Sequence, residues 1–419
     1  MTRASLAAAL LGALASSLAA QGSAAEPSCV THCHGREATA FRECVHAGEL
    51  SCLECHGGDP KAHRDKRKAH DPAAGYVGKP VRTAIPELCG KCHSDPLRMH
   101  AYGLPTDQLA HYRTSGHGRA LAAGDAAAAV CTDCHGTHRV LRADDPRAPT
   151  ARANQPATCG RCHSDSALMD SHELPADSVA RFRRSAHGVA LLEEDARGAP
   201  SCADCHGSHG ATPPAVHEVV QVCGQCHRNT ADHFRRSAHD DAERMRCRVC
   251  HEETAPEYHR AGCAACHGAH AIAAPGSWLY RGQEVGRCGH CHREDGRADG
   301  VVAAVGAGRR RLQEAMAATR REIREAKARG VFLDYEQVYL RESERALVSL
   351  QPLTHSLDAA AIAGHLEEGL ARQARARESI AKKAKVLRDR RLLLSGLAVV
   401  LLLLAALVAL KLQAVRRLS

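Results

Sequence analysis

The sequence predicts a mainly α-helical protein: an irregular body of short helices and loops, then a long helical hairpin, then one C-terminal transmembrane helix. Three observations predict this class. Residues 26–300 are rich in Cys and His and are broken up by Gly and Pro, which favours short helices and loops. Residues 301–391 carry apolar side chains at helical spacing, and residues 392–412 form one long apolar run. No segment reads as a β-strand of any length.

Residues 1–25 have the features of a secretory signal peptide. Arg3 precedes an apolar run from Leu6 to Leu18, and small residues lead to a cleavage point after Ala25. An uncleaved membrane anchor is the alternative, which the shortness of the run disfavours. We therefore expect an exported protein.

The body cannot build an ordinary hydrophobic core. The chain has 21 Cys and 29 His, but only 4 Phe, 7 Tyr and 1 Trp. Aromatic side chains normally supply much of the buried apolar area. Another group must therefore fill the interior, or disulfide bonds or metal ions must cross-link it.

Nine copies of the pattern Cys-x-x-Cys-His lie in the body. The residue frequencies of the chain predict about 0.07 copies by chance, so the pattern is not accidental. The copies begin at Cys52, Cys89, Cys131, Cys159, Cys202, Cys223, Cys247, Cys263 and Cys288.

The motifs belong to a larger internal repeat. The segment “CGKCHSDPLRMHAYGLPTDQLAHYRTSGHGRAL” from Cys89 resembles “CGRCHSDSALMDSHELPADSVARFRRSAHGVAL” from Cys159, which starts 70 residues later. A shortened copy begins at Cys223 and ends with “CRVCH” at Cys247, and “CAACHGAH” at Cys263 repeats the second half of the unit. We expect a two-motif unit that is repeated along the body.

The motif is typical of covalent haem attachment. Two thiols at this spacing can form thioethers with the two vinyl groups of one haem, and the adjacent His can ligate its iron. Zinc ribbons need no His after each pair, and redox-active pairs usually occur singly on a βαβ fold. Disulfide bonds within each pair would leave the nine histidines unexplained. We therefore expect haem c at nine sites.

These residues resemble the multihaem c-type cytochromes built from doubled Cys-x-x-Cys-His repeats, over Cys29 to His292. The attaching cysteines would be Cys52, Cys55, Cys89, Cys92, Cys131, Cys134, Cys159, Cys162, Cys202, Cys205, Cys223, Cys226, Cys247, Cys250, Cys263, Cys266, Cys288 and Cys291. The iron-ligating histidines would be His56, His93, His135, His163, His206, His227, His251, His267 and His292.

A tenth site is expected at the sequence “CVTHCH”, where three residues separate Cys29 from Cys33 and His34 follows. Looser spacings occur in the family that the chain resembles, so we favour haem attachment here. A disulfide bond that involves Cys29, Cys33 or Cys44 is the alternative.

Histidine is also the expected second axial ligand, because the chain holds few Met residues and 19 His outside the ten attachment sites. Two groups recur within the repeat. The first follows “SG” or “SA”, and the second follows the “CHG-x” start. The candidates are His117, His187 and His239, then His138, His209 and His270.

Other histidines form a weaker pool of candidate ligands, and the two on the predicted hairpin, His355 and His365, are expected at the surface. The pool comprises His63, His70, His100, His172, His217, His233 and His259.

Residues 301–391 predict two long helices. Apolar side chains follow a four-three spacing in both, and Pro352 and “THSLD” mark the break, with Asp358 as an N-cap. This segment holds 19 basic and 12 acidic residues. Its charge suits anionic headgroups or an acidic partner rather than nucleic acid; a spacer between haems and bilayer is the alternative.

Residues 392–412 predict a single transmembrane helix, and a buried core helix is the alternative. Export would leave the body at the periplasmic face of a bacterial inner membrane and residues 413–419 in the cytoplasm. The basic residues before the span outnumber those after it, which by itself predicts the reverse orientation. We give more weight to the signal peptide, because haem attachment also requires export.

About ten haems would leave roughly one per 27 residues, which forces them close together. The sequence therefore predicts electron transfer from a quinol-oxidising membrane protein to periplasmic or outer-membrane acceptors. The alternative is an enzyme similar to ammonia-forming nitrite reductases or hydroxylamine oxidoreductases. Such an enzyme needs one haem iron with an open position.

Overall fold

The computed structural model of the chain describes residues 34–59, 61–62, 65–214, 218–237, 239–240, 263–272 and 297–418. The predicted signal peptide lies outside these residues, as do Cys29, Cys33 and the motifs that begin at Cys247 and Cys288. The chain divides into two compact units, Met1–Pro213 and Pro214–Ser419, and each is described by itself.

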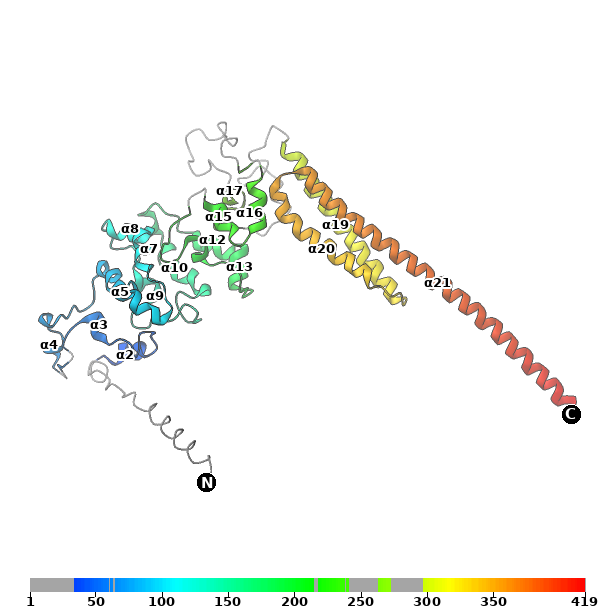
Figure 1. The fold of residues 1–419 in the computed structure, drawn as a ribbon, viewed down its shortest axis with the longest axis horizontal. Coiled ribbons are helices and arrows are strands. Elements are labelled where there is room, and N and C mark those ends of the chain that lie inside the picture. The colour runs from blue at the N-terminus through cyan, green and yellow to red at the C-terminus, as the bar shows by residue number, and fades with distance from the viewer. Residues whose placement is uncertain are drawn as a thin grey trace, which may run out of the picture. The chain divides into compact units, whose positions relative to one another are not determined.

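The described residues are mainly helical, which confirms the predicted fold class at this level. They contain no β-strand, and Ala47 and Leu50 form an isolated bridge. Short helices joined by turns build the first unit (Figure 1). Its α-helices are α2 (Gly35–Arg42), α3 (Cys52–His56), α4 (Lys66–Ala69), α5 (Ile85–His93), α6 (Pro96–Met99), α7 (Gln108–Thr114), α8 (Gly116–Ala122), α9 (Cys131–His135), α10 (Gln155–His163), α11 (Ser166–Asp170), α12 (Ser178–Arg184), α13 (Ala186–Leu192) and α14 (Cys202–His206).

The predicted internal repeat is present in the structure. Helices α5 to α9 recur as α10 to α14, and each begins 70 or 71 residues after its counterpart. A 3-10 turn precedes each copy: η3 (Arg82–Ala84) and η5 (Arg152–Asn154). Further 3-10 turns are η2 (Pro72–Ala74) and η4 (His100–Tyr102).

One arginine at the start of each copy forms an ion pair with the second motif of the same copy. Arg82 contacts the Asp133 carboxylate at 2.7 Å and donates to the Ala128 carbonyl at 2.8 Å. In the next copy, Arg152 contacts Asp204 at 3.1 Å, again beside a backbone carbonyl. Charge-assisted hydrogen bonds of this kind fix two chain segments against each other. The two motifs of a copy are thus held as one structural unit.

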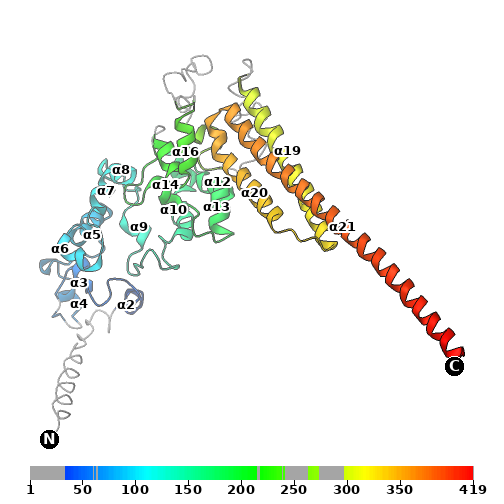
Figure 2. The same cartoon turned by 45° about the vertical axis from the view of Figure 1, so that its right-hand side comes forward.

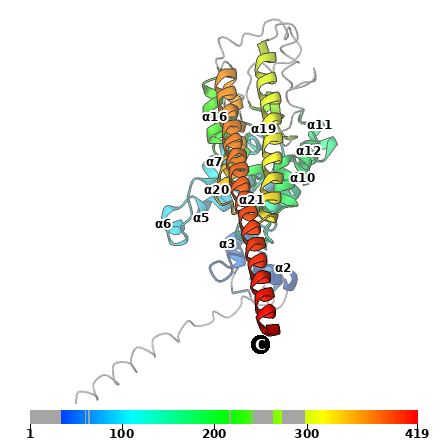
Figure 3. The same ribbon diagram turned by 90° about the vertical axis from the view of Figure 1, so that its right-hand side faces the viewer.

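The second unit begins with α15 (Val219–Gly224), which holds Cys223, and continues with α16 (Arg228–Arg235) and the motif helix α17 (Cys263–His267). It continues with α19 (Arg297–Ala328), α20 (Tyr335–Leu353), the 3-10 turn η9 (Thr354–Ser356) and α21 (Ala359–Leu418). Helices α19 and α20 both pack along α21 (Figures 2 and 3). We call α19, α20, η9 and the α21 residues 359–391 the stalk.

The stalk has three helices, so the predicted two-helix hairpin is wrong. Gly330 ends α19 in the left-handed conformation, with φ of 83°. The Val331 N–H donates to the Ala326 carbonyl and the Gly330 N–H to the Lys327 carbonyl, both at 2.9 Å. This is a helix C-cap that glycine favours because it lacks a Cβ atom. The chain therefore turns back at residues 329–334.

The predicted break after α20 and the cap of α21 are confirmed. Leu357 has φ of 56°, and the Asp358 carboxylate accepts hydrogen bonds from the N–H groups of Ala360 and Ala361 at 3.0 Å each. Pro352 lies within the last turn of α20. The helix that follows runs on without interruption into residues 392–412, as predicted.

Apolar side chains from all three helices fill the stalk. Leu312 and Ile362 are completely buried. The residues that continue the predicted four-three spacing from Leu312 are buried as well: Met316, Thr319, Ile323 and Ala326. Polar groups complete the interior: Gln373 donates to the Ser343 hydroxyl at 2.7 Å, and Lys383 pairs with the buried Glu336 at 2.8 Å. The stalk thus has an ordinary side-chain core.

Helix α21 is long and apolar enough to cross a membrane, and its apolar window is not buried by the described protein. Residues 392–412 would span about 31 Å at the helical rise, which matches a bilayer's hydrocarbon core. Leu393 and Leu402 are each more than 70% exposed. Such exposed leucines require a lipid or protein covering.

Candidate haem-iron sites

Most of the described Cys-x-x-Cys-His motifs lie on short helical turns. Helices α3, α9, α14 and α17 consist of the five motif residues alone, whereas α5 and α10 end in theirs. One helical turn brings both thiols of a motif to the same side. Where the sequence continues “CHG”, glycine then ends the turn with positive φ, 82° at Gly136 and 80° at Gly207. This explains why the recurring pattern contains Gly.

The first cysteines of two different motifs meet in pairs. The thiols of Cys89 and Cys131 are hydrogen-bonded to each other, and this bond raises the pKa of Cys89 and lowers that of Cys131. The same contact and the same directions recur in the two other copies. The further pairs are Cys159 with Cys202 and Cys223 with Cys263. Two groups attached to such neighbouring sulfurs would lie edge to edge.

Opposed histidine rings recur with one spacing. In six pairs of rings, the centroids lie 6.0 or 6.1 Å apart. Each pair contains one histidine from an attachment motif and one from elsewhere in the chain. With the motif histidine first, the pairs are His34–His70, His93–His46, His56–His138, His163–His117, His135–His209 and His267–His355.

This spacing fits two imidazoles on opposite sides of one metal ion. A metal–imidazole bond is about 2 Å long, and the ring centre lies roughly 1 Å beyond the nitrogen, so two centroids across an ion are about 6 Å apart. The planes differ, from 8° between His135 and His209 to 74° between His34 and His70. Stacking of the rings would not produce a constant distance at such different angles.

The protonation of these rings also fits metal binding. Burial lowers the pKa of His46, His93, His117, His135, His209, His267 and His355. A lowered pKa keeps the imidazole neutral near pH 7, and only the neutral ring has a lone pair to give to a metal.

Several of the rings are oriented through their second nitrogen. The His56 Nδ1 lies 2.7 Å from the Gly78 carbonyl oxygen, and the His355 Nδ1 lies 3.0 Å from that of Gln351. Because a carbonyl only accepts, Nδ1 must carry the proton in both rings, which leaves Nε2 available for a metal.

The α7–α8 corner explains how one of these rings is placed. Ser115 caps α8 by accepting a hydrogen bond from the Gly118 N–H at 2.9 Å. A Cβ atom at Gly118 would lie 1.9 Å from the Tyr112 carbonyl oxygen, so only glycine permits this approach. His117 between them is thereby directed to His163. Ser185 and Gly188 repeat the arrangement around His187.

Of the predicted second ligands, the structure places His117, His138 and His209 opposite attachment histidines. The other three, His187, His239 and His270, are half-buried at the equivalent positions. The ligand role of all six stays a prediction.

Sequence reasoning gave no role to His46 and expected His355 at the surface, yet both oppose a motif histidine. His70 came only from the weaker pool. Neither His46 nor His355 recurs within the repeat, so the sequence carried no signal for them.

Two other histidines are engaged in different contacts. His172, a member of the weaker pool, has Nδ1 2.8 Å from the Leu168 carbonyl and Nε2 2.8 Å from the Asp125 carboxylate. The His365 Nε2 lies 2.9 Å from the Ala346 carbonyl oxygen. Because these nitrogen atoms already make hydrogen bonds, they are not available to bind iron.

Cys44, which belongs to no motif, is buried with a free thiol. Its sulfur lies 3.5 Å from the His46 Nδ1. A disulfide bond from Cys44, one of the alternatives for the N-terminal motif, is thus not formed in this structure.

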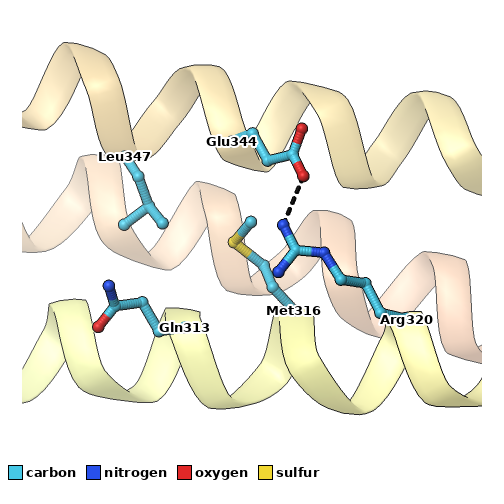
Figure 4. A pocket seen from close by; sticks show the side chains of 5 residues that line it. All are labelled: Gln313, Met316, Arg320, Glu344 and Leu347. Atoms are coloured by element: carbon cyan, nitrogen blue, oxygen red, sulfur yellow. Dashed lines mark hydrogen bonds and ion pairs between the residues drawn. The ribbon is translucent and has the colours of Figure 1, made fainter.

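Zinc-like clusters are not seen in the described ranges, where no three or more His, Cys, Asp and Glu side chains converge so as to hold a metal ion. One surface pocket, of about 340 Å³, lies between α19 and α20 (Figure 4). The ion pair between Arg320 and Glu344, 2.5 Å long, lies beside it, and neither Cys nor His lines it. We assign it no role.

Comparisons of the chain with protein-family models, with curated proteins and with solved structures found no match. The functional assignment therefore depends on the chemistry and geometry of the residues described above.

Proposed function

We propose that the protein is an exported, membrane-anchored multihaem c-type cytochrome that transfers electrons. The observation that carries this proposal is the six opposed histidine pairs, because each combines an attachment-motif histidine with a second ring at the spacing of one metal ion. Two cysteines would hold each haem and two histidines would ligate its iron. A bound haem supplies reversible one-electron chemistry, and two strong axial ligands leave no open position for a substrate.

The cysteine contacts support a continuous series of attachment sites in the first unit. Within a copy, the first cysteines of both motifs touch, as at Cys89 and Cys131. Between copies, Cys134 lies near Cys159, and burial raises the pKa of the Cys134 thiol to about 11. Cys55 likewise lies near Cys92. Haems held by these cysteines would therefore lie close together along the first unit, as rapid electron transfer requires.

Helix α21 supports attachment to a membrane, and the orientation with the body in the periplasm is part of the proposal. A quinol-oxidising membrane protein is the proposed donor, and periplasmic or outer-membrane proteins are the proposed acceptors. The single candidate span among the described residues favours a separate quinone-binding partner.

Electron paramagnetic resonance of the oxidised protein tests electron transfer against catalysis. We expect low-spin ferric haem throughout, unchanged by nitrite or hydroxylamine, because both axial positions are taken by histidine. A substantial high-spin signal that shifts when either compound is added would contradict the carrier and favour the enzyme.

A further inference from the structure

The turn between α20 and α21 presents a histidine to a motif that lies far from it in sequence. The rings of His355 and His267 lie 6.0 Å apart and are inclined by 26°. His267 ends α17 in the motif of Cys263 and Cys266, whereas His355 lies in η9. Both are half-buried.

Neighbouring groups hold the His355 ring and the Cys263 motif in position. The His355 Nδ1 faces the Gln351 carbonyl oxygen at 3.0 Å, so its Nε2 remains for a metal. Helix α16 packs against both α20 and η9. Cys263 packs against the buried Val220, Ala231 and Phe234, of which the last two belong to α16, and its thiol meets that of Cys223.

We propose that His355 is the distal axial ligand of the haem attached at Cys263 and Cys266, so that the stalk completes a haem site of the cysteine-rich segment. This inference rests on the proposed function. The second ligand would then come from outside the part of the sequence that contains the motifs. Haem insertion at this motif then ties the α20–α21 turn to α17.

His365 provides a matched control close to the same turn. It lies about two turns after the start of α21, and its Nε2 is 2.9 Å from the Ala346 carbonyl oxygen and 3.0 Å from the Ser349 hydroxyl. It faces another helix rather than a motif histidine. Loss of its imidazole should therefore leave every iron unchanged.

The experiment compares full-length wild type, His355→Ala and His365→Ala after maturation in cells that attach haem c. His355→Ala should keep the wild-type haem count, because thioether bonds hold the haem, but gain a high-spin signal of about one haem per chain. Added imidazole should convert that signal to low spin. His365→Ala should match the wild type.

A second substitution guards against a variant that fails to fold. His355→Met should stay low-spin, and the potential of one haem should rise, because thioether sulfur raises the potential of haem iron relative to imidazole. A fully low-spin His355→Ala protein with all its haems, or a His355→Met protein with unchanged potentials, would overturn the proposal. Wild type without any haem would instead overturn the proposed function itself.

Discussion

The imidazole of His172 links two copies of the repeat through an ion pair. It lies after α11, whereas its partner Asp125 lies between α8 and α9. The hydrogen bonds to the Leu168 carbonyl and then to Asp125 raise the pKa of His172. The contact therefore contributes stability only while His172 is protonated.

The pH dependence of unfolding follows from this shift. Because the folded-state pKa is raised, the stabilisation is complete below the unfolded value of about 6.5 and is lost as pH rises through the folded value. We expect His172→Ala to lower the thermal unfolding midpoint at about pH 6 and to leave it unchanged well above the folded pKa.

His111→Ala is the matched control, because His111 pairs with Asp107 inside a single helix of one copy. It should retain the pH dependence of the wild type. An equal effect of His172→Ala at acidic and alkaline pH would contradict the ionic role of His172.

Recurrence along the chain allowed some of the opposed histidines to be predicted. His117, His138 and His209 stand at repeated positions, and the structure places each opposite a motif histidine. His46 and His355 stand at unique positions, and their partners lie 47 and 88 residues away in the sequence, at His93 and His267. Only the folded chain reveals such pairs.

At the scale of single elements, the backbone at the α7–α8 corner determines where His117, a candidate iron ligand, is placed. A methyl group at Gly118 would meet the Tyr112 carbonyl oxygen at 1.9 Å, so α8 would have to shift. Because His117 is the residue before Gly118 on α8, it would move with the helix.

We expect Gly118→Ala to displace His117 from His163 and to convert about one haem per chain to high spin. The strain should also cost roughly 1–3 kcal/mol of stability. Electron paramagnetic resonance and thermal unfolding measure the two effects.

Gly116→Ala provides the control, since the second copy of the repeat already has Ala186 at this place. A Cβ atom there would lie 3.5 Å from the Ala211 carbonyl oxygen, which is an ordinary contact. Low-spin haem throughout in Gly118→Ala would show that the corner does not position His117.

The stalk shows how much of an element could be predicted from sequence. The seam from Leu312 to Ala326 and the cap at Asp358 were predictable, because helical spacing and capping are local signals. The end of α19 was missed although Gly330 supplied the usual signal for a helix end. The helical pattern on both sides of Gly330 predicts one continuous helix. The reversal at residues 329–334 is seen only in the packing of α19 and α20 in the structure.

At the scale of each whole unit, two kinds of interior occur within one chain. The stalk is filled by side chains such as Leu312, Ile362 and Leu366. Among its described residues, the first unit has only small apolar clusters, for example Leu121 with Ala128 and Val130. Bound haems would supply the apolar bulk that its side chains lack.

Helix α21 separates the His355 turn from the membrane span. The 33 residues from Ala359 to Arg391 extend about 50 Å at the helical rise. At the far end, Arg391 donates to the Arg329 carbonyl oxygen at 2.7 Å, so the α19–α20 turn lies beside the start of the span. This arrangement favours the spacer role of the basic stalk, and contact with anionic headgroups would be limited to its last turns.

Haem stoichiometry of the purified protein tests the central claim most directly. The pyridine haemochrome spectrum against protein mass should give nine or ten covalent haems, one for each attachment motif in the sequence. The double variant Cys131→Ala/Cys134→Ala should contain one haem fewer, whereas Cys44→Ala should keep the full number. Folded protein without covalent haem, or an unchanged count in the double variant, would contradict the account.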